Sequence, residues 1–473
     1  MADAEYDVIV LGAGPVGENV ADRAVQGGLS AALVESELVG GECSYWACMP
    51  SKALLRSGQA VREAHRVAGA AEAVTGRIDV EAVLARRNSF THDWKDDSQV
   101  AWAEHAGITV VRGHGRISGP KRVTATAPDG AERSLTARQA VVVAVGTEAA
   151  VPDVDGLRAS RPWTSREATG SQSVPGRLAV IGGGVVAVEM ATAYADLGSK
   201  VTVIARSGLL RGLEPFAGEL VGEGLRGLGV ELMLGAAPTR VARTGAGVEI
   251  QTSEGITVVA DEVLAATGRS PRTADIGLDS VGLVPGSWLT VDDTLRVEGF
   301  DWLYAVGDVN HRALLTHQGK YQARAAGDAI VARAAGAALA DGAWGAHVAT
   351  ADHAAVPQVV FSDPEVAAVG LTESAARDAG MTARVVDYDL GGVAGAALFA
   401  DGYAGRARMV VDEDRRVIVG ATFVGSAVAE LLHAATTAVV GEVPIERLWH
   451  AVPAYPTVSE VWLRLLEAYR SGA

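Results

Sequence analysis

The chain has 473 residues, enough for about three domains at roughly 150 residues each. Its 57 acidic residues outnumber 41 basic ones, and a net charge of −16 repels nucleic acid and anionic membranes. No apolar run approaches the roughly 18 to 20 residues of a membrane span, so neither nucleic acid nor membrane is an expected partner. The N-terminal MADAEYDVIVLGAG lacks a signal-peptide pattern, and two cysteines exclude a secreted disulfide framework, so we expect a cytoplasmic protein.

The first predicted unit is a strand, a glycine turn, a helix and a second strand. In YDVIVLGAGPVGENVADRAVQGGLSAALVE, apolar residues 8–11 precede the turn and residues 31–34 form the second strand, which ends at Glu35. Small residues let such a backbone approach a pyrophosphate at a helix N-terminus, while the acidic residue holds ribose hydroxyls. The spacing of 23 residues (35 − 12) is near the expected value of about 20 and predicts an unphosphorylated adenosine ribose. The glycines of this turn are Gly12, Gly14 and Gly17.

A second unit, RLAVIGGGVVAVEMATAYADLGSKVTVIAR, repeats the pattern 170 residues later (182 − 12), with Gly182 and Gly184 in the turn. The position equivalent to the ribose-binding acid is Ala205, and Arg206 and Arg211 follow it. Arginine near this strand end accommodates a 2′-phosphate, and its planar fork suits bidentate phosphate contact. We therefore expect NADPH in preference to NADH, with ordinary surface charges as the alternative interpretation of the two arginines.

The remaining pattern indicates how these units are completed. Each glycine unit later meets an apolar strand that ends in a glycine turn, at Gly146 and Gly268. WLYAVGDVN is a further strand and turn, and from Pro357 onward mixed strands and helices suggest a separate domain. We predict an α/β protein with two Rossmann-like, doubly wound domains and an α+β C-terminal domain. Other predicted segments are helical over 58–105 and 315–335 and strand-rich over 108–138.

Both cysteines of the chain, Cys43 and Cys48, stand in GGECSYWACMPSKALLR ahead of a helical run. Four residues separate them, and a loop-to-helix bend could bring their α-carbons to the roughly 5.5 Å that a disulfide favours. Pro50 fits the first helical turn, and a thiolate at a helix N-terminus has a lowered pKa. The pair can therefore cycle between disulfide and thiol–thiolate. A structural bridge and two unpaired core cysteines are the alternatives; no metal site is expected, because no further cysteine or histidine has ligand spacing.

GGECSYWACMPSK resembles the redox-active segment of the flavin-dependent pyridine nucleotide–disulfide oxidoreductases, the family of lipoamide dehydrogenase, glutathione reductase and mercuric reductase. The resemblance includes the tandem glycine units, YAVGDV, PQVVFSDPEVAAVG and YPTVSE, and spans nearly the whole chain. It implies FAD on the first unit, NAD(P)H on the second and a homodimer. The domains it implies are an FAD-binding domain (1–150 and 275–345), an NAD(P)H-binding domain (151–274) and a dimerisation domain (346–473).

The same resemblance implies a role for five further positions. Asp308 of GDV would hold the FAD ribityl chain. Lys52 would lie near flavin N5, paired with Glu189 of GGGVVAVE, although an ordinary helix-face acid is the alternative at that position. Cys48 would be the thiolate in contact with the flavin, and Cys43 the one that exchanges with substrate.

One position departs from the family pattern. Disulfide reductases of this family usually read HPT-x-x-E near the C-terminus, where this chain has Tyr455 and keeps Glu460. An imidazole with a pKa near 6.5 shuttles protons to a leaving thiol, whereas a phenol with a pKa near 10 is a poor proton shuttle. The phenol can still donate a hydrogen bond or provide a metal-ligand oxygen. His450 could replace the imidazole only along a different loop path, and a surface histidine is the alternative.

We therefore expect an NADPH-dependent FAD oxidoreductase with a redox-active Cys43–Cys48 pair and a second site at Tyr455 and Glu460. Its small-molecule acceptor would need little acid catalysis: a quinone, a soft metal ion or an unusual disulfide. Mercuric reductases also carry tyrosine near this place and keep both cysteines. Soluble transhydrogenases share the tryptophan at Trp46 and a YPT segment, so a transhydrogenase stays an alternative, as do a lipoamide dehydrogenase-like reductase and a flavin-bound redox sensor.

Overall fold

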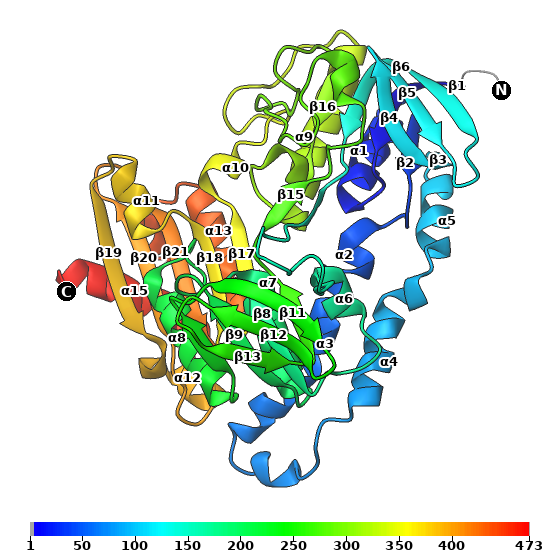
Figure 1. Ribbon diagram of the computed structural model, residues 1–473. Helices are drawn as coiled ribbons and strands as arrows, with labels where there is room; N and C mark the ends of the chain where they lie inside the picture. The colour runs from blue at the N-terminus through cyan, green and yellow to red at the C-terminus, as the bar shows by residue number, and fades with distance from the viewer. Residues whose placement is uncertain (1–3, 473) are drawn as a thin grey trace. The chain divides into compact units, whose positions relative to one another are not determined.

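The computed structural model describes residues 4–472, which form two compact units. Unit 1 contains the residues up to Pro50, Asn88–Glu148 and Arg269–His353. Unit 2 contains Ser51–Arg87, Ala149–Gly268 and the chain from Ala354 onward. The labels of Figure 1 are used for their helices and strands.

Unit 1 is built on a seven-stranded sheet with the order β3-β2-β1-β6-β5-β4, to which β16 adds by pairing with β6. The strands β1, β2, β3 and β16 run parallel to their neighbours, while β4 and β5 form an antiparallel extension beside β6. The parallel strands are buried along their apolar stretches, as expected for a sheet covered on both faces. Their bounds are β1 (Ala4–Leu11), β2 (Ala31–Glu35), β3 (Thr109–Arg112), β4 (His114–Gly119), β5 (Arg122–Thr126), β6 (Glu132–Val143) and β16 (Leu303–Ala305).

Two helices of unit 1, α1 (Pro15–Gln26) and α9 (Thr316–Ala334), pack against each other along their length (Figure 1). Small residues permit this close approach: a Cβ at Gly319 would lie 2.6 Å from the Val16 side chain, and one at Gly327 would lie 2.6 Å from Arg23 Cβ. The helices run in the same direction, because contacts advance along both chains together. Their N-termini therefore open on the same edge of the unit.

Unit 2 contains a second parallel sheet, β10-β9-β8-β14, and an antiparallel three-stranded sheet, β11-β12-β13. The helix α7 (Val185–Asp196) follows β8, and buried alanines and Val188 on α7 contribute to the core of this unit. The helix α8 (Pro215–Gly227) follows β9. Strand bounds are β8 (Arg177–Ile181), β9 (Lys200–Ala205), β10 (Glu231–Leu234), β11 (Pro238–Thr244), β12 (Gly247–Thr252), β13 (Thr257–Ala260) and β14 (Glu262–Ala265).

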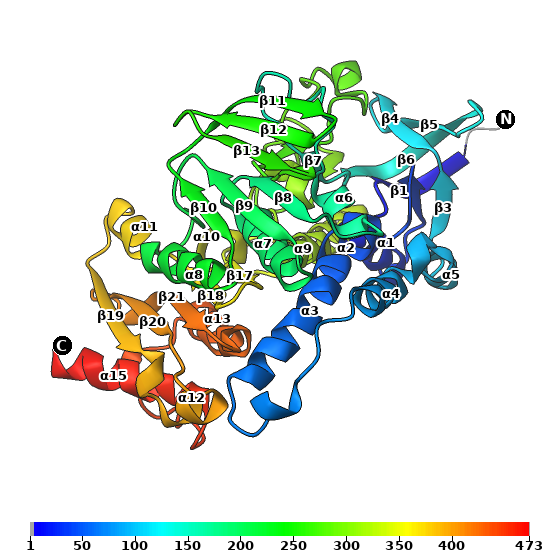
Figure 2. The same ribbon diagram turned by 60° about the horizontal axis from the view of Figure 1, so that its bottom comes forward.

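The C-terminal part of unit 2 is an antiparallel sheet with the order β17-β18-β21-β20-β19. The helix α13 (Leu432–Val440) packs on β18 and β21, and α15 (Val461–Ser471) packs on β19 and β20 (Figure 2). Trp462 of α15 makes an edge contact with Phe423 of β21. Strand bounds are β17 (Pro357–Val360), β18 (Glu365–Gly370), β19 (Ala383–Asp389), β20 (Arg406–Asp412) and β21 (Val417–Gly425).

The structure confirms the predicted fold class and refines its elements. The segment predicted as helical over 58–105 consists of three helices rather than one continuous run, because polar and glycine-containing turns interrupt it. Those helices are α3 (Cys48–His65), α4 (Val80–Phe90) and α5 (Asp97–His105). Among the described residues, no helix has the length and apolar character needed to cross a membrane.

Candidate active site

The first glycine turn joins β1 to α1 in unit 1. Gly12 has a φ of +95°, and a Cβ there would lie 2.5 Å from the carbonyl oxygen of Ala144, so only glycine fits without displacement. Gly17 packs against the same turn, because a Cβ at this position would lie 2.0 Å from Gly12 O. Gly14 caps α1, and no side chain within residues 4–472 makes a capping hydrogen bond to the first amides of the helix.

Glu35 lies at the end of β2, beside this turn. Its carboxylate accepts hydrogen bonds of 2.7 Å from the backbone amides of Ala13 and Glu37. Burial raises the pKa of Glu35, while the two amide hydrogen bonds act in the opposite direction. The acid predicted to bind ribose is thus held directly against the glycine turn.

The second acid of unit 1, Asp308, lies in the turn Gly307–Asn310 after β16. Thr147 Oγ1 donates a hydrogen bond of 2.6 Å to Asp308 Oδ2. Arg269 Nε lies 3.8 Å from the same oxygen, and Arg269 also forms a 2.8 Å ion pair with Glu42. Burial raises the pKa of Asp308, opposed by Thr147 and Arg269. Gly146, just before Thr147, has a φ of +69° and open space where a Cβ would stand.

Cys43 and Cys48 lie at the junction of α2 (Gly41–Tyr45) and α3. They are not joined by a disulfide in this structure, both are half-buried, and their side chains hydrogen-bond to each other. Cys48 Sγ lies 3.3 Å from Thr316 Oγ1, the first residue of α9. Two sulfurs within hydrogen-bonding distance can form a disulfide after a small movement, so the arrangement is competent for dithiol–disulfide exchange.

The protonation of the two sulfurs is coupled. The hydrogen bond with Cys48 and burial raise the pKa of Cys43 well above its usual range, while Thr316 and Lys320 oppose this rise. The second proton is therefore hard to remove once one sulfur is ionised. Cys43 is accordingly the sulfur that keeps its proton in the reduced pair.

The second glycine turn, between β8 and α7, repeats these features within unit 2. Gly182 has a φ of +132°, and a Cβ there would lie 2.1 Å from Ala266 O. Gly184 caps α7 without a side-chain hydrogen bond, and Gly268 has open space at its Cβ position. Arg206 and Arg211 follow β9 and are exposed. Neither is engaged in an ion pair within residues 4–472, so both guanidinium groups are available to an anion.

Lys52 and Glu189 form an ion pair in unit 2, with Lys52 Nζ 2.7 Å from Glu189 Oε2. The amide of Phe361 donates to the other carboxylate oxygen at 3.1 Å, and the Phe361 ring lies 4.9 Å from Lys52 Nζ. Glu189 is only 3% exposed, so its negative charge is compensated locally by the lysine and the amide. The alternative of an ordinary helix-face acid does not describe this buried, paired side chain.

The C-terminal segment places Tyr455 and Glu460 in different surroundings. Tyr455 is 75% exposed, whereas Glu460 is 5% exposed at the start of α15. Glu460 Oε1 accepts a 2.5 Å hydrogen bond from Arg464, one turn later on the same helix. Its Oε2 is buried and has no hydrogen-bond partner within residues 4–472. His450 is exposed.

Comparison with protein families matches this architecture in two consecutive parts. Residues 6–332 match the model described as pyridine nucleotide-disulphide oxidoreductase, and residues 356–465 match the dimerisation domain of the same family. The chain is a pyridine nucleotide-disulphide oxidoreductase. It is accordingly an enzyme of the flavoprotein disulfide reductase type, with FAD and NAD(P)H as the cofactors typical of the family.

This oxidoreductase is similar to curated proteins of two activities. It is 31% identical to a mercuric reductase of Shigella flexneri, over 96% of this chain and 79% of the relative. It is 30% identical to a dihydrolipoyl dehydrogenase of Chlamydia muridarum, over 97% of this chain and 95% of the relative. The two activities share the family scaffold, so the likeness alone does not choose the acceptor.

Solved structures show the same fold over the full length of the oxidoreductase. LpdA of Mycobacterium tuberculosis superposes with a TM-score of 0.81 at 26% identity, covering 99% of this chain and 100% of the other. The Cu(II) complex of the HOCl-induced flavoprotein disulfide reductase RclA of Escherichia coli has a TM-score of 0.83 at 23% identity, covering 99% of each chain.

The residues of unit 1 fit FAD. Uncapped helix amides beside Gly14 suit a pyrophosphate, and a Cβ at Gly41 would lie 2.7 Å from Gly14 Cα, so the cysteine-bearing segment closes tightly on the glycine turn. The Glu35 and Asp308 carboxylates provide acceptors for sugar hydroxyls. All of these features belong to unit 1.

Sequence reasoning missed several side chains around these residues. Thr316 contacts Cys48, and its place at the start of the predicted helix 315–335 was the only available signal. Glu18 on α1 has a buried Oε1 without a hydrogen-bond partner within residues 4–472, and burial raises its pKa to about 7. Lys320 acts electrostatically on both Glu18 and Cys43. No motif marks Glu18 or Lys320, since both act through packing between α1 and α9.

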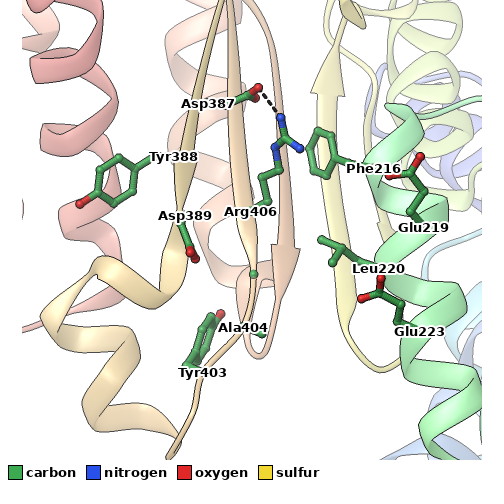
Figure 3. Close-up of a pocket in the computed structure, with 11 residues that line it drawn as sticks. Phe216, Glu219, Leu220, Glu223, Asp387, Tyr388, Asp389, Tyr403, Ala404 and Arg406 are labelled. Atoms are coloured by element: carbon green, nitrogen blue, oxygen red, sulfur yellow. Dashed lines mark hydrogen bonds and ion pairs between the residues drawn. The ribbon is translucent and has the colours of Figure 1, made fainter. Parts of the chain in front are cut away.

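Unit 2 also has an open cavity of about 560 Å³ between α8 and the sheet strands β19 and β20 (Figure 3). Asp387 pairs with Arg406, whose guanidinium lies over the Phe216 ring. Glu219 and Glu223 of α8 also line the cavity. None of the predicted site residues lines it, so it is separate from the chemistry described above.

Proposed function

We propose that this oxidoreductase uses NADPH and passes electrons through Cys43 and Cys48 to an acceptor that needs little acid catalysis. A quinone, a soft metal ion or an unusual disulfide meets this description. The observation that carries the proposal is the C-terminal segment. It offers an exposed phenol at Tyr455 where the family usually has an imidazole, and one oxygen of its buried acid, Glu460, already accepts a hydrogen bond from Arg464.

The chain's own residues support a dithiol cycle. FAD, when bound, supplies two-electron transfer between the nicotinamide and the sulfurs. Reduction of the Cys43–Cys48 bond takes two electrons and one proton and leaves one thiol and one thiolate. Thr316 Oγ1, 3.3 Å from Cys48 Sγ, can donate a hydrogen bond to that thiolate. The raised pKa of Cys43 keeps the remaining proton on the other sulfur.

The acceptor class follows from which steps need a proton donor. When a dialkyl disulfide is reduced, one of its sulfurs leaves as a thiolate that must be protonated. General acid catalysis accelerates this step by about 10² to 10⁴-fold. A soft metal ion instead binds thiolate directly and takes two electrons as the disulfide re-forms. Similarity to a mercuric reductase favours a soft metal ion as one of the acceptors. A quinone takes the same two electrons as the disulfide re-forms, with one proton from the remaining thiol and the second from solvent.

The nucleotide preference rests on the two arginines after β9. Arg206 and Arg211 are exposed and free of ion pairs within residues 4–472, and no carboxylate stands at the strand end. A carboxylate there would repel a 2′-phosphate, whereas two guanidinium groups attract it.

We further propose a homodimer in which the C-terminal segment serves the neighbouring protomer. A dimerisation-domain match over 356–465 supports association. Val452 and Tyr455 are 85% and 75% exposed, a high exposure for large apolar and aromatic side chains. Such side chains are expected to become buried when a second copy binds.

The test is an anaerobic titration with NADPH followed by a panel of acceptors. We expect a long-wavelength absorption band from a thiolate in contact with the flavin, and higher turnover with quinones or soft metal ions than with lipoamide or glutathione disulfide. Cys48→Ser should abolish that band, and Cys43→Ser should keep it while losing dithiol-dependent turnover. Efficient lipoamide reduction by the unmodified protein would contradict the proposed acceptor class.

The same variants distinguish the alternatives. If Cys43→Ser leaves turnover unchanged with NADPH and NAD⁺ as the two substrates, the protein is a transhydrogenase in which the sulfurs are bystanders. Negligible NADPH oxidation across the panel would instead favour a redox sensor.

A further inference from the structure

A buried polar network lies behind the turn that carries Asp308. Its centre is Asp352, which lies near the C-terminal end of unit 1. The Asp352 carboxylate is 0% exposed. Gln318 Nε2 donates to Asp352 Oδ1 at 2.7 Å, and Gln322 Nε2 donates to Asp352 Oδ2 at 2.9 Å. Both glutamines are buried and stand one turn apart on α9. One carboxylate therefore holds two successive turns of this helix.

The other end of the Gln322 amide contacts the turn Gly307–Asn310. Gln322 Oε1 accepts hydrogen bonds of 2.8 Å from the Gly307 amide and from Asn310 Nδ2. A side-chain amide has one accepting and one donating end, and an ionised carboxylate only accepts. Asp352 thus fixes which way the amide points. If the amide were reversed, its NH₂ group would meet two donors and its oxygen would meet a carboxylate.

Two parts of the candidate site depend on the elements held in this way. Asp308 is the residue after Gly307, so its position follows the turn that Gln322 holds. Thr316, which contacts Cys48 Sγ at 3.3 Å, begins the helix that carries Gln318 and Gln322. The carboxylate at 352 is therefore linked to the acid of the flavin site and to the helix end beside the sulfurs.

We propose that Asp352 is a positioning residue for the flavin site, which orients Gln322 so that the Gly307–Asn310 turn presents Asp308 to the ribityl chain of FAD. Its surroundings are consistent with a charged acceptor: Arg312 Nη1 lies 3.7 Å from Asp352 Oδ2. That nitrogen is buried and has no hydrogen-bond partner within residues 4–472, so its charge faces the carboxylate at close range. The inference rests on the proposed assignment of Asp308 to FAD.

The polarity of the network gives a test by exchange. Asp352→Asn places an NH₂ group against an amide donor, so one buried hydrogen bond must be lost. Gln322→Glu places two carboxylates against each other. In the double variant every hydrogen bond can re-form, and only the bond between positions 322 and 352 has its donor and acceptor exchanged. The new amide at 352 donates to the new carboxylate at 322 and accepts from Gln318, while that carboxylate accepts from Gly307 and Asn310.

The measurement is the dissociation constant of FAD, from quenching of flavin fluorescence on reconstitution of the full-length apoprotein, together with the visible spectrum of the bound flavin. We expect each single variant to weaken FAD binding about tenfold or more, because a buried polar group is left unsatisfied. The double variant should return to within about threefold of the unmodified protein, since the pairwise hydrogen bonds are restored. Asp328→Asn is the matched control: it removes a carboxylate of α9 that pairs with Arg23, and FAD affinity should change less than about twofold.

Asp308→Ala distinguishes a failure of the Asp308 assignment from a failure of the positioning role of Asp352. If this variant leaves FAD affinity unchanged, the assignment of Asp308 is wrong and the positioning role falls with it. If Asp308→Ala weakens binding while Asp352→Asn does not, only the positioning role is overturned. A double variant that binds FAD no better than the weaker single variant also overturns it, and this outcome is decisive even if one single variant fails to fold.

Discussion

Glu18 gives a quantitative test of the packing between α1 and α9. It stands on the first turns of α1, and its Oε1 is buried without a hydrogen-bond partner within residues 4–472. Burial is the main cause that raises its pKa from 4.5 to about 7; Glu35 adds to the rise and Lys320 opposes it. We therefore expect Glu18→Gln to stabilise the protein at pH 8, because it removes the cost of ionising a buried carboxyl.

The magnitude follows from linkage. A folded-state pKa above the unfolded value gives stability that is fully present below pH 4.5 and is lost as the pH rises through about 7. The loss at pH 8 is about 3 kcal/mol, since each pKa unit corresponds to about 1.4 kcal/mol. An unfolding entropy of about 2.1 cal/mol/K per residue over 473 residues is about 1 kcal/mol/K, so Tm should rise by about 3 °C. Near pH 5 the gain should be below about 1 °C, because Glu18 is still protonated in the folded state and the pH is only about half a unit above the unfolded pKa of 4.5.

The assay is thermal unfolding of the FAD-loaded protein from pH 5 to pH 8, followed by circular dichroism and by release of flavin fluorescence. Asp22→Asn is the control and should show no comparable trend with pH. It removes an exposed carboxylate on the same helix, which accepts a hydrogen bond from Gln26. A Tm difference between Glu18→Gln and the unmodified protein that stays constant from pH 5 to pH 8 would refute the reasoning.

Three further predictions concern the reaction. Replacing Arg206 and Arg211 by alanine should raise KM for NADPH about tenfold or more and leave KM for NADH nearly unchanged in steady-state assays, because only NADPH carries the 2′-phosphate. Thr316→Val removes the 3.3 Å contact with Cys48 Sγ and a hydrogen bond that lowers the pKa of Cys43, so the first ionisation of the coupled pair, followed by thiolate absorbance, should move to higher pH; an unchanged midpoint would contradict this. Tyr455→His should raise steady-state turnover with small disulfides by up to about 10² to 10⁴-fold, the range of general acid catalysis, because Oε2 of Glu460 is left to orient the new imidazole.

The glycine turns were predictable because each glycine has a backbone reason that the sequence pattern expresses. Gly12 and Gly182 both have positive φ and would clash with a neighbouring strand if they carried a Cβ. The doubly wound fold class followed from the repeat of this turn, since strand, turn and helix recur at the same spacing. The NADPH preference and the individual catalytic roles were also stated from the sequence, and they stay predictions.

Side chains that meet through tertiary packing were not predictable. Thr316 and Cys48 are 268 residues apart in the sequence, and Gln322 reaches Asp352 across 30 residues. Glutamine on a predicted helix is usually a solvated residue, so burial of Gln322 had no local signal. Glu18 likewise has the sequence appearance of an exposed helix acid, and its burial comes from tertiary packing around α1.

In the C-terminal segment, the identity of residue 455 alone does not determine how protons could reach the sulfurs. Tyrosine at 455 removes an imidazole, but the structure adds that Glu460 is committed to Arg464 through a 2.5 Å hydrogen bond within α15. However, Glu460 Oε2 has no hydrogen-bond partner within residues 4–472, so it can still accept from the second nitrogen of a histidine introduced at 455. We therefore predict that the tyrosine, rather than the acid, leaves the dithiol without a tuned proton donor, and that acceptors which bind thiolate directly react more readily than small disulfides.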